Sequence, residues 1–334
     1  MISRWKTAAV ALLTVAGAAG ATAAQPADVP MGCDRACYEQ LMSRYLDALV
    51  AHDPGRMPFA DNVKYTELGQ RMEVGDGFWR TASGLGKYRQ FAVDPEGGQV
   101  AFEGVMQEDR SPLLVSIRLR VQLGKITEAE TVFYRKGAAP GWNDLGMDAM
   151  EKDPTIPAPY TTPTPPGRRL SREELIATGA AYFQGVEHND GKGYYPFTDD
   201  CNRRENGVST TNSKTMPAIT PGFNPMAMGC KAQFDLGWFS VVSAVHNRRF
   251  PLVDVERQVV LGYAVFDMDS PNATVTAPDG KVIPMNFGRP SSLLVAELFR
   301  VQGPGPGRIQ AVEAVVGPVP YHLNAVWTEG VIRK

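Results

Sequence analysis

The sequence lacks the motifs that mark nucleotide-dependent enzymes and nucleic-acid-binding proteins. No Gly-x-Ser-x-Gly, Walker-type or dinucleotide-binding motif occurs in its 334 residues. The formal net charge is -2, and Lys and Arg are interspersed with Asp and Glu, so no basic stripe is available for nucleic acid. We therefore expect no nucleotide cofactor and no nucleic-acid partner, and a small uncharged ligand fits this charge balance better.

Histidine and cysteine are scarce, with four of each. The sequence has no Cys-x-x-Cys motif and no pair of histidines at metal-ligand spacing, so we expect no metal and no cofactor. His52 and His188 are predicted to lie at helix ends, where capping roles are common. His246 is the one histidine that we include as a candidate ligand-binding residue.

Long apolar runs are confined to the N-terminus. Arg4 and Lys6 precede an apolar run over residues 8–21, which is too short to span a bilayer and ends in small residues. This pattern predicts a cleavable signal peptide over residues 1–24, a periplasmic or secreted protein, and no membrane span. Cysteines in that oxidising environment form disulfides, and of the three pairings we favour Cys201–Cys230 with Cys33–Cys37.

The most informative feature of the sequence is an internal repeat. Residues 44–53 recur in outline as residues 181–190, and residues 58–69 recur as residues 196–207. Two later segments also match in order, namely 113–122 with 293–302 and 125–130 with 308–313. These four matches, in the same order in both halves, predict two copies of one fold.

The region between the two copies is rich in proline. Seven prolines lie within residues 137–169, six of them from Pro154 to Pro166, a composition that favours an extended connector over a packed element. We therefore predict a first domain over residues 32–136 and a second over residues 170–330.

Each copy is predicted to begin with a helix and to continue in strands. Apolar residues recur at helical spacing in both opening segments, and Ser171 with Glu174 forms a capping box in the second. A further helix is predicted from about Cys230 to Arg248. The strand-like segments are 63–67, 99–107, 113–121 and 126–134 in the first copy, and 202–206, 259–267, 273–277, 281–286, 292–302 and 309–316 in the second. The expected class is α+β, with a curved antiparallel sheet wrapped around helices to enclose a conical cavity.

This order of elements resembles the NTF2-like (SnoaL-like) superfamily. The motifs Cys33-Asp-Arg, Tyr65-Thr-Glu, Gly77-Phe-Trp-Arg-Thr and Glu205-Asn-Gly resemble tandem-domain secreted proteins of that group. The resemblance implies two tandem cone domains. Its members include isomerases, dehydratases, cyclases, epoxide hydrolases, other lyases and non-catalytic binders. It also implies pairing through sheet faces, as a dimer or as an intramolecular pseudo-dimer.

One difference between the repeats points to chemistry. Ile117 in the first copy is matched by Glu297 in the second, where it lies between Val295 and Phe299 in an alternating apolar row. If this face lines the cavity, burial raises the pKa of Glu297 and makes it a candidate proton acceptor or donor. The alternative is an ordinary ion pair with a nearby arginine.

Several other polar and aromatic residues are candidates for the same cavity. Asp267 ends an alternating strand and is either a catalytic helper or a turn residue. Glu67 and Glu205 end the first strand of each copy, where they line the cavity rim or accept backbone hydrogen bonds. The remaining candidates are Arg203 as a catalytic helper and Asn206, Tyr65, Trp79 and Trp238 as ligand-binding residues. Trp79 is expected in a loop at the cavity mouth or in the core, and Gln233 on a solvated helix surface.

These residues predict cofactor-independent acid-base chemistry in the second domain. The expected substrate is a small, largely apolar or aromatic molecule, and the expected reaction is an isomerisation, a dehydration or another lyase step. The alternative is a non-catalytic secreted module that binds a ligand or another protein.

Overall fold

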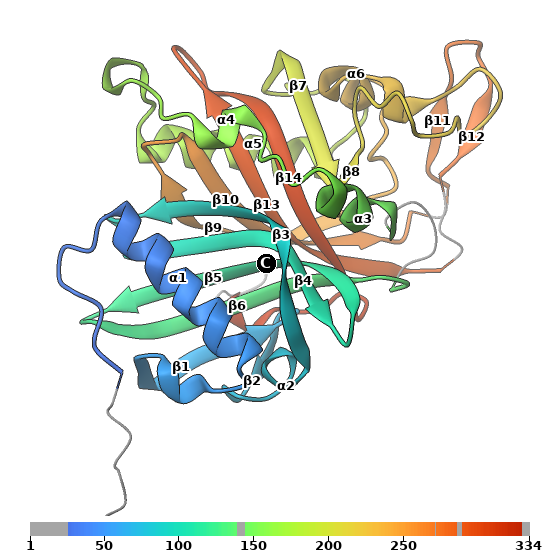
Figure 1. Cartoon of the computed structure of the whole chain (residues 1–334). Coiled ribbons are helices and arrows are strands. Elements are labelled where there is room, and N and C mark those ends of the chain that lie inside the picture. Colours follow the sequence, from blue (N-terminus) through green and yellow to red (C-terminus); the bar gives the residue numbers. More distant parts are fainter. Residues whose placement is uncertain (1–25, 139–143, 271, 286–288, 329–334) are drawn as a thin grey trace, which may run out of the picture.

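The computed structural model describes residues 26–138, 144–270, 272–285 and 289–328 (Figure 1). The predicted signal peptide lies outside the described residues. The chain folds into two α+β cone domains, each built on a six-stranded sheet. Sheet one has the order β2-β1-β6-β5-β4-β3, and sheet two has the order β8-β7-β14-β13-β10-β9.

The strands of sheet one are β1 (Phe59–Glu67), β2 (Gln70–Met72), β3 (Ala82–Asp94), β4 (Gln99–Glu108), β5 (Ser111–Gln122) and β6 (Lys125–Arg135). Those of sheet two are β7 (Phe197–Glu205), β8 (Val208–Ser209), β9 (Ala244–Asp254), β10 (Val259–Met268), β13 (Ser291–Gln302) and β14 (Arg308–Val319). A separate hairpin is formed by β11 (Thr274–Thr276) and β12 (Val282–Pro284). The equivalent strand order in the two sheets agrees with the sequence repeat.

Both sheets are mixed, whereas the sequence predicted purely antiparallel ones. β1 pairs parallel with β6, and β7 pairs parallel with β14. The other neighbouring strands pair antiparallel. The first strand of each domain therefore lies beside the last, which brings the two ends of the repeat together.

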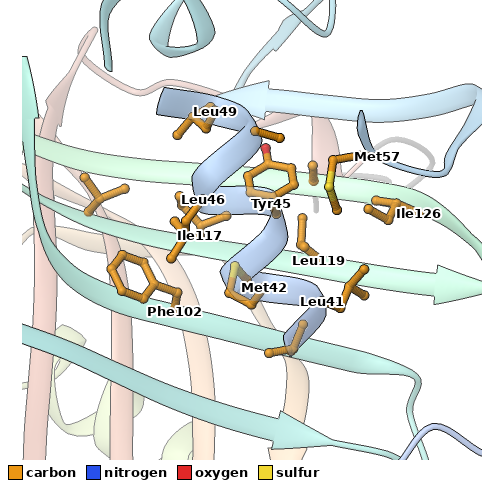
Figure 2. Close-up of a cluster of buried hydrophobic side chains, with 14 of the residues drawn as sticks. Leu41, Met42, Tyr45, Leu46, Leu49, Met57, Phe102, Ile117, Leu119 and Ile126 are labelled. Carbon is orange, nitrogen blue, oxygen red and sulfur yellow. The ribbon is translucent and has the colours of Figure 1, made fainter. Parts of the chain in front are cut away.

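A long helix covers one face of each sheet. These helices are α1 (Arg35–Val50) and α5 (Arg172–Glu187), and the predicted Ser171–Glu174 capping box begins α5. The apolar face of α1 points at sheet one, where Met42 and Leu46 pack with Phe102 and Ile117 (Figure 2). Helical periodicity predicted this packing because a one-sided apolar stripe needs a partner surface.

The opposite faces of the two sheets pack against each other. Their shared core contains Ala101 and Leu114 from sheet one and Leu261 and Ala296 from sheet two. Each sheet therefore lies between its own long helix and the other sheet, which is the arrangement of an intramolecular pseudo-dimer (Figure 1).

Two buried aspartates connect the domains in a reciprocal manner. Asp94 at the end of β3 accepts hydrogen bonds from Arg172 of α5 and from the backbone N–H of Val253. Asp254 at the end of β9 accepts them from Arg35 of α1 and from the backbone N–H of Val93. We call these two sets of contacts the aspartate clasp.

The predicted connector contains packed helices. These are α3 (Leu145–Lys152) and α4 (Ala158–Thr161). Met147, Met150 and Tyr160 are buried in the core between the sheets. The prediction of an extended connector is wrong for this part because the spacing of the two methionines gives α3 an apolar side. The predicted domain boundaries remain predictions.

The prediction of a helix from Cys230 to Arg248 is also wrong beyond Asp235. The structure has α6 (Cys230–Asp235), after which Gly237 takes a positive φ of 76° and the chain continues into the edge strand β9. A left-handed glycine ends a helix at little cost. Among the strands, the sequence did not predict the four edge strands β2, β3, β8 and β9, whereas every predicted strand overlaps one in the structure.

The favoured disulfide pairing is confirmed, with Cys33–Cys37 and Cys201–Cys230. The second bond joins α6 to β7. Among the described residues, every helix is too short or too polar to cross a bilayer.

Removing the Cys201–Cys230 bond with serine substitutions should lower the free energy of unfolding by about 3–4 kcal/mol, because it closes a loop of 29 residues. The Cys33–Cys37 bond has a sequence separation of 4 and should contribute about 2 kcal/mol or less. Urea denaturation of the two double variants tests this. Equal losses would contradict the loop-closure argument.

Candidate functional site

Glu297 lies inside the cone of the second domain. Its strand neighbours Val295 and Phe299 belong to the core between α5 and sheet two, whereas Ala296 and Leu298 belong to the core between the sheets. Glu297 is 3% exposed, and its counterpart Ile117 is fully buried in the first domain. The strand alternation therefore places a carboxyl group where the first domain has a methyl group.

Arg203 of β7 is the main cation of this interior. Its Nη1 donates to Oε1 of Gln233 at 3.0 Å, and its Nη2 donates to Glu205. Its guanidinium lies 4.6 Å from the centre of the Phe239 ring. Gln233 in turn donates to the carbonyl oxygens of Thr210 and Pro225. The arginine is thus fixed on two sides.

Gln233 is fully buried, so the prediction of a solvated position is wrong. The physical reason is local, since the Cys201–Cys230 bond holds α6 against β7 and the polar side of this short helix faces Arg203. We call Glu297, Arg203, Glu205 and Gln233 the interior polar cluster.

The electrostatics of the cluster favour a neutral Glu297. Burial, reinforced by the charge of Glu205 and opposed by that of Arg203, raises the pKa of Glu297 to about 8. Oε2 of Glu297 and Nε of Arg203 are buried and have no hydrogen-bond partner among the described residues. Buried polar atoms in folded proteins are almost always paired, so these two call for an explanation. The cluster can hold a proton near neutral pH and can offer a hydrogen-bond donor.

Asp267 does not join this cluster. Gly262 is the partner of Glu297 across β10 and β13, whereas Asp267 pairs with Ser292, five residues further along β10. That separation is roughly 17 Å. Asp267 also shares the strand face of Val265, which is buried in the core between the sheets.

The structure instead brings Asp267 together with two histidines. Oδ2 of Asp267 lies 2.5 Å from Nδ1 of His322 and 3.2 Å from Nε2 of His246. Burial raises the pKa of Asp267, but hydrogen bonds from Ser292 and His322 outweigh it and hold the pKa below its ordinary value. Sequence reasoning included Asp267 and His246 separately and missed His322, because the three residues are far apart in the chain.

The first-domain candidates are structural. Tyr65 donates to Glu67, which also accepts the backbone N–H of Phe78 at 2.5 Å, as the alternative interpretation of Glu67 expected. Burial raises the pKa of Glu67, although both hydrogen bonds lower it. Trp79 is 1% exposed and packs edge-on against Tyr45, so it lies in the core and not at a cavity mouth.

Asn206 and Trp238 also lie away from Glu297. The side chain of Asn206 pairs with both backbone groups of Val316, which fixes the turn after β7 to β14. Trp238 is half-buried and packs with the cluster of Phe223 and the β11–β12 hairpin. Of the predicted site residues, therefore, Arg203 and Glu205 come together with Glu297, whereas Asp267 meets His246 and Tyr65 meets Glu67 elsewhere.

Comparison with known protein families gives a clear assignment. The family described as Domain of unknown function (DUF8021) matches residues 33–133 and 168–316. The chain belongs to this family. The two matched segments contain the long helices α1 and α5, and the gap between them contains the connector with α3 and α4.

Solved structures similar to this DUF8021 chain include three proteins of about one third its length. An NTF2-like protein of unknown function from Cytophaga hutchinsonii is 12% identical, with 29% of this chain and 89% of the other covered and a TM-score of 0.25. AclR, a putative hydroxylase from Streptomyces galilaeus, is 14% identical, with 36% of this chain and 97% of AclR covered and a TM-score of 0.25. A putative ketosteroid isomerase from Kribbella flavida is 16% identical (32% and 84% covered, TM-score 0.22). A comparison with curated protein sequences gave no match.

Two surface hollows of the DUF8021 chain lie elsewhere. One, of about 740 Å³, is lined by Arg35, Glu39 and Glu256 near the first disulfide. The other, of about 630 Å³, is lined by His52 and Arg135, among others. Neither is lined by any member of the interior polar cluster.

Proposed function

We propose that the second domain catalyses cofactor-independent proton transfer on a small, largely apolar or aromatic molecule. The reaction class is an isomerisation, a dehydration or another lyase step, and Glu297 accepts and returns the proton. The observation that carries the proposal is the buried Oε2 of Glu297, which has no hydrogen-bond partner in the described part of the chain and belongs to a carboxyl group whose pKa is raised to about 8. A general base is most effective when its pKa lies near the working pH.

Arg203 has a separate role in this proposal. Proton removal next to a carbonyl group leaves negative charge on oxygen, which a fixed cation or N–H donor stabilises. The Nε–H of Arg203 has no partner among the described residues, while its other nitrogens are held by Gln233 and Glu205. Arg203 would stabilise the oxyanion, and Glu205 would position Arg203.

The aromatic lining supports an apolar substrate. Tyr182, Phe234 and Phe299 surround the cluster, with the ring of Tyr182 at 4.9 Å from that of Phe299 and 5.6 Å from that of Phe234. Their tight packing also supports the second candidate, a non-catalytic binding module in which Glu297 is structural. The two disulfides further support our proposal that the protein works in the periplasm or outside the cell.

Deuterium uptake provides a test that does not need the natural substrate. The mature protein is incubated in D2O with a panel of cyclic and aromatic ketones, and exchange at the carbon next to the carbonyl is followed by NMR. We expect exchange at a rate that rises about tenfold per pH unit and levels off above pH 8, because only ionised Glu297 accepts a proton.

Glu297→Gln should abolish this exchange. Glu103→Gln is the matched control, because Glu103 is also a buried carboxyl with a raised pKa but shares its face of β4 with Ala101 and Val105, which belong to the core between the sheets. Exchange that survives in Glu297→Gln would rule out the assigned base. Retention of a small molecule in native mass spectrometry without exchange of any ketone would favour the binding module.

A further inference from the structure

The second polar cluster lies where four neighbouring strands of sheet two end. His246 comes from β9, Asp267 from β10 and Ser292 from β13, and His322 follows β14. One ligand atom from each of His246, Asp267 and His322 lies within 4.8 Å of the others. We propose that these three residues bind a divalent first-row transition metal such as zinc.

A positive charge between Nε2 of His246 and Oδ2 of Asp267 would stabilise the close contact of these two atoms. Nδ1 of His246 lies 3.2 Å from Oδ1 of Asn247. The amide of Asn247 points this way because its Nδ2 donates to Asn324, and an amide oxygen can only accept a hydrogen bond. With Nδ1 as the donor in this contact, Nε2 of a neutral ring is an acceptor. Among the described residues this Nε2 is buried without a hydrogen bond of good geometry, and it lies 3.2 Å from Oδ2 of Asp267. Two acceptors at this distance repel each other unless a cation or a second proton lies between them.

The distances suit one small ion. Nitrogen and oxygen ligands lie about 2.0–2.2 Å from zinc, so two ligands of one tetrahedral ion are roughly 3.3 Å apart. His246 and Asp267 already have this spacing. The side chain of His322 is 52% exposed and can retreat from its 2.5 Å contact with Asp267 to make room.

A supporting shell orients the ligands. The hydroxyl of Ser292 donates to Oδ1 of Asp267 at 2.6 Å, which leaves Oδ2 facing both imidazoles. The hydroxyl oxygen of Ser292 also accepts the backbone N–H of His322 at 2.8 Å. Metal sites in proteins usually have such second hydrogen bonds to the ligands, and these bonds fix the orientation of each ligand.

The ligand set selects the class of metal. Calcium and magnesium prefer oxygen ligands alone, whereas two imidazoles with one carboxylate suit zinc, cobalt, iron or nickel. Three protein ligands with one half-exposed histidine leave a coordination position open toward solvent. The site is independent of the proposed chemistry at Glu297, because the two lie on opposite faces of sheet two.

Cobalt binding tests the proposal. The mature protein, treated with chelator and dialysed, is titrated with cobalt chloride alone, and the visible d–d absorption is followed. We expect one equivalent to bind with the intense bands of a four- or five-coordinate ion, and zinc chloride to displace it. Ser292→Ala should weaken binding by roughly 10–100-fold, and His246→Gln or His322→Ala should weaken it more.

His188→Ala is the matched control, since His188 is exposed and lies 3.5 Å from the carboxylate of Glu187 without a second histidine. It should bind cobalt like the unmodified protein. His322→Ala removes only a half-exposed side chain, and its circular dichroism spectrum shows whether the fold is retained. The proposal fails if the unmodified protein binds no stoichiometric metal, or if His246→Gln and His322→Ala both bind it unchanged. In the first case a proton is shared between His246 and Asp267.

Discussion

Glu297→Gln should stabilise the protein at pH 7 by about 3 kcal/mol while abolishing its proposed activity. In the unfolded chain the glutamate has an ordinary pKa near 4.5, and in the folded protein its pKa is about 8. Between these values the folded state binds more protons than the unfolded state, so stability falls as the pH rises. Each unit of pH in this window costs about 1.4 kcal/mol. Glutamine has the shape of the protonated acid and carries no such cost.

The measurement is the free energy of unfolding in urea for both proteins between pH 4 and pH 9. The difference should be near zero at pH 4, grow through pH 7 and level off above pH 8. Glu73→Gln, at an exposed glutamate, is the control and should give a flat difference. A Glu297→Gln difference that does not change with pH would mean that Glu297 is not a buried acid of raised pKa, and the proposed base would be lost with it.

Asp254→Ala should lower the free energy of unfolding by about 3 kcal/mol, and Asp94→Ala should have a similar effect. Removing one partner of a buried ion pair leaves the other partner and the backbone donors unsatisfied. Asp254 is fully buried and bonded to Arg35, and its loss also frees the backbone N–H of Val93. Because Arg35 keeps its ion pair with Glu256 in the variant, we expect a loss of stability at the lower end of the range for broken buried ion pairs.

Urea denaturation with a fluorescence probe in each domain would detect a further consequence. The aspartate clasp joins the domains, so either variant should separate one transition into two. Asp53→Ala is the control, because Asp53 pairs with Arg56 at the surface and should contribute less than about 1 kcal/mol. The double variant should lose less free energy of unfolding than the two single variants together. The reason is that Asp254 binds Val93, the residue next to Asp94, and Asp94 binds Val253, the residue next to Asp254. A loss below 1 kcal/mol for both single variants would show that the clasp does not hold the domains.

Part of the candidate site could be predicted because it depends on local pattern. The inward position of Glu297 follows from the alternation of Val295, Glu297 and Phe299 along one strand. Its raised pKa follows from burial on that face. The partners of Arg203 could not be predicted in the same way, because Gln233 reaches it only through the placement of α6 against β7.

The histidine and aspartate cluster shows the other limit. Its members come from two strands and from the segment after a third, and none of the spacings between residues 246, 267 and 322 is a recognised metal motif. The order of strands in sheet two brings them together. A spacing rule detects ligands on one helix or one turn and fails when each ligand comes from a different strand.

The sequence favoured the disulfide pairing without deciding it, and by itself it determined the repeat, the capping box of α5, the inner strands and the face on which Glu297 lies. All of these depend on periodicity or on residues near one another in the chain. Only the tertiary structure decided the edge strands β2, β3, β8 and β9, the helices of the connector, the burial of Gln233, the aspartate clasp and the meeting of His246, Asp267 and His322. The physical reason is that these features depend on contacts between segments far apart in sequence, whose geometry is set when the two sheets pack.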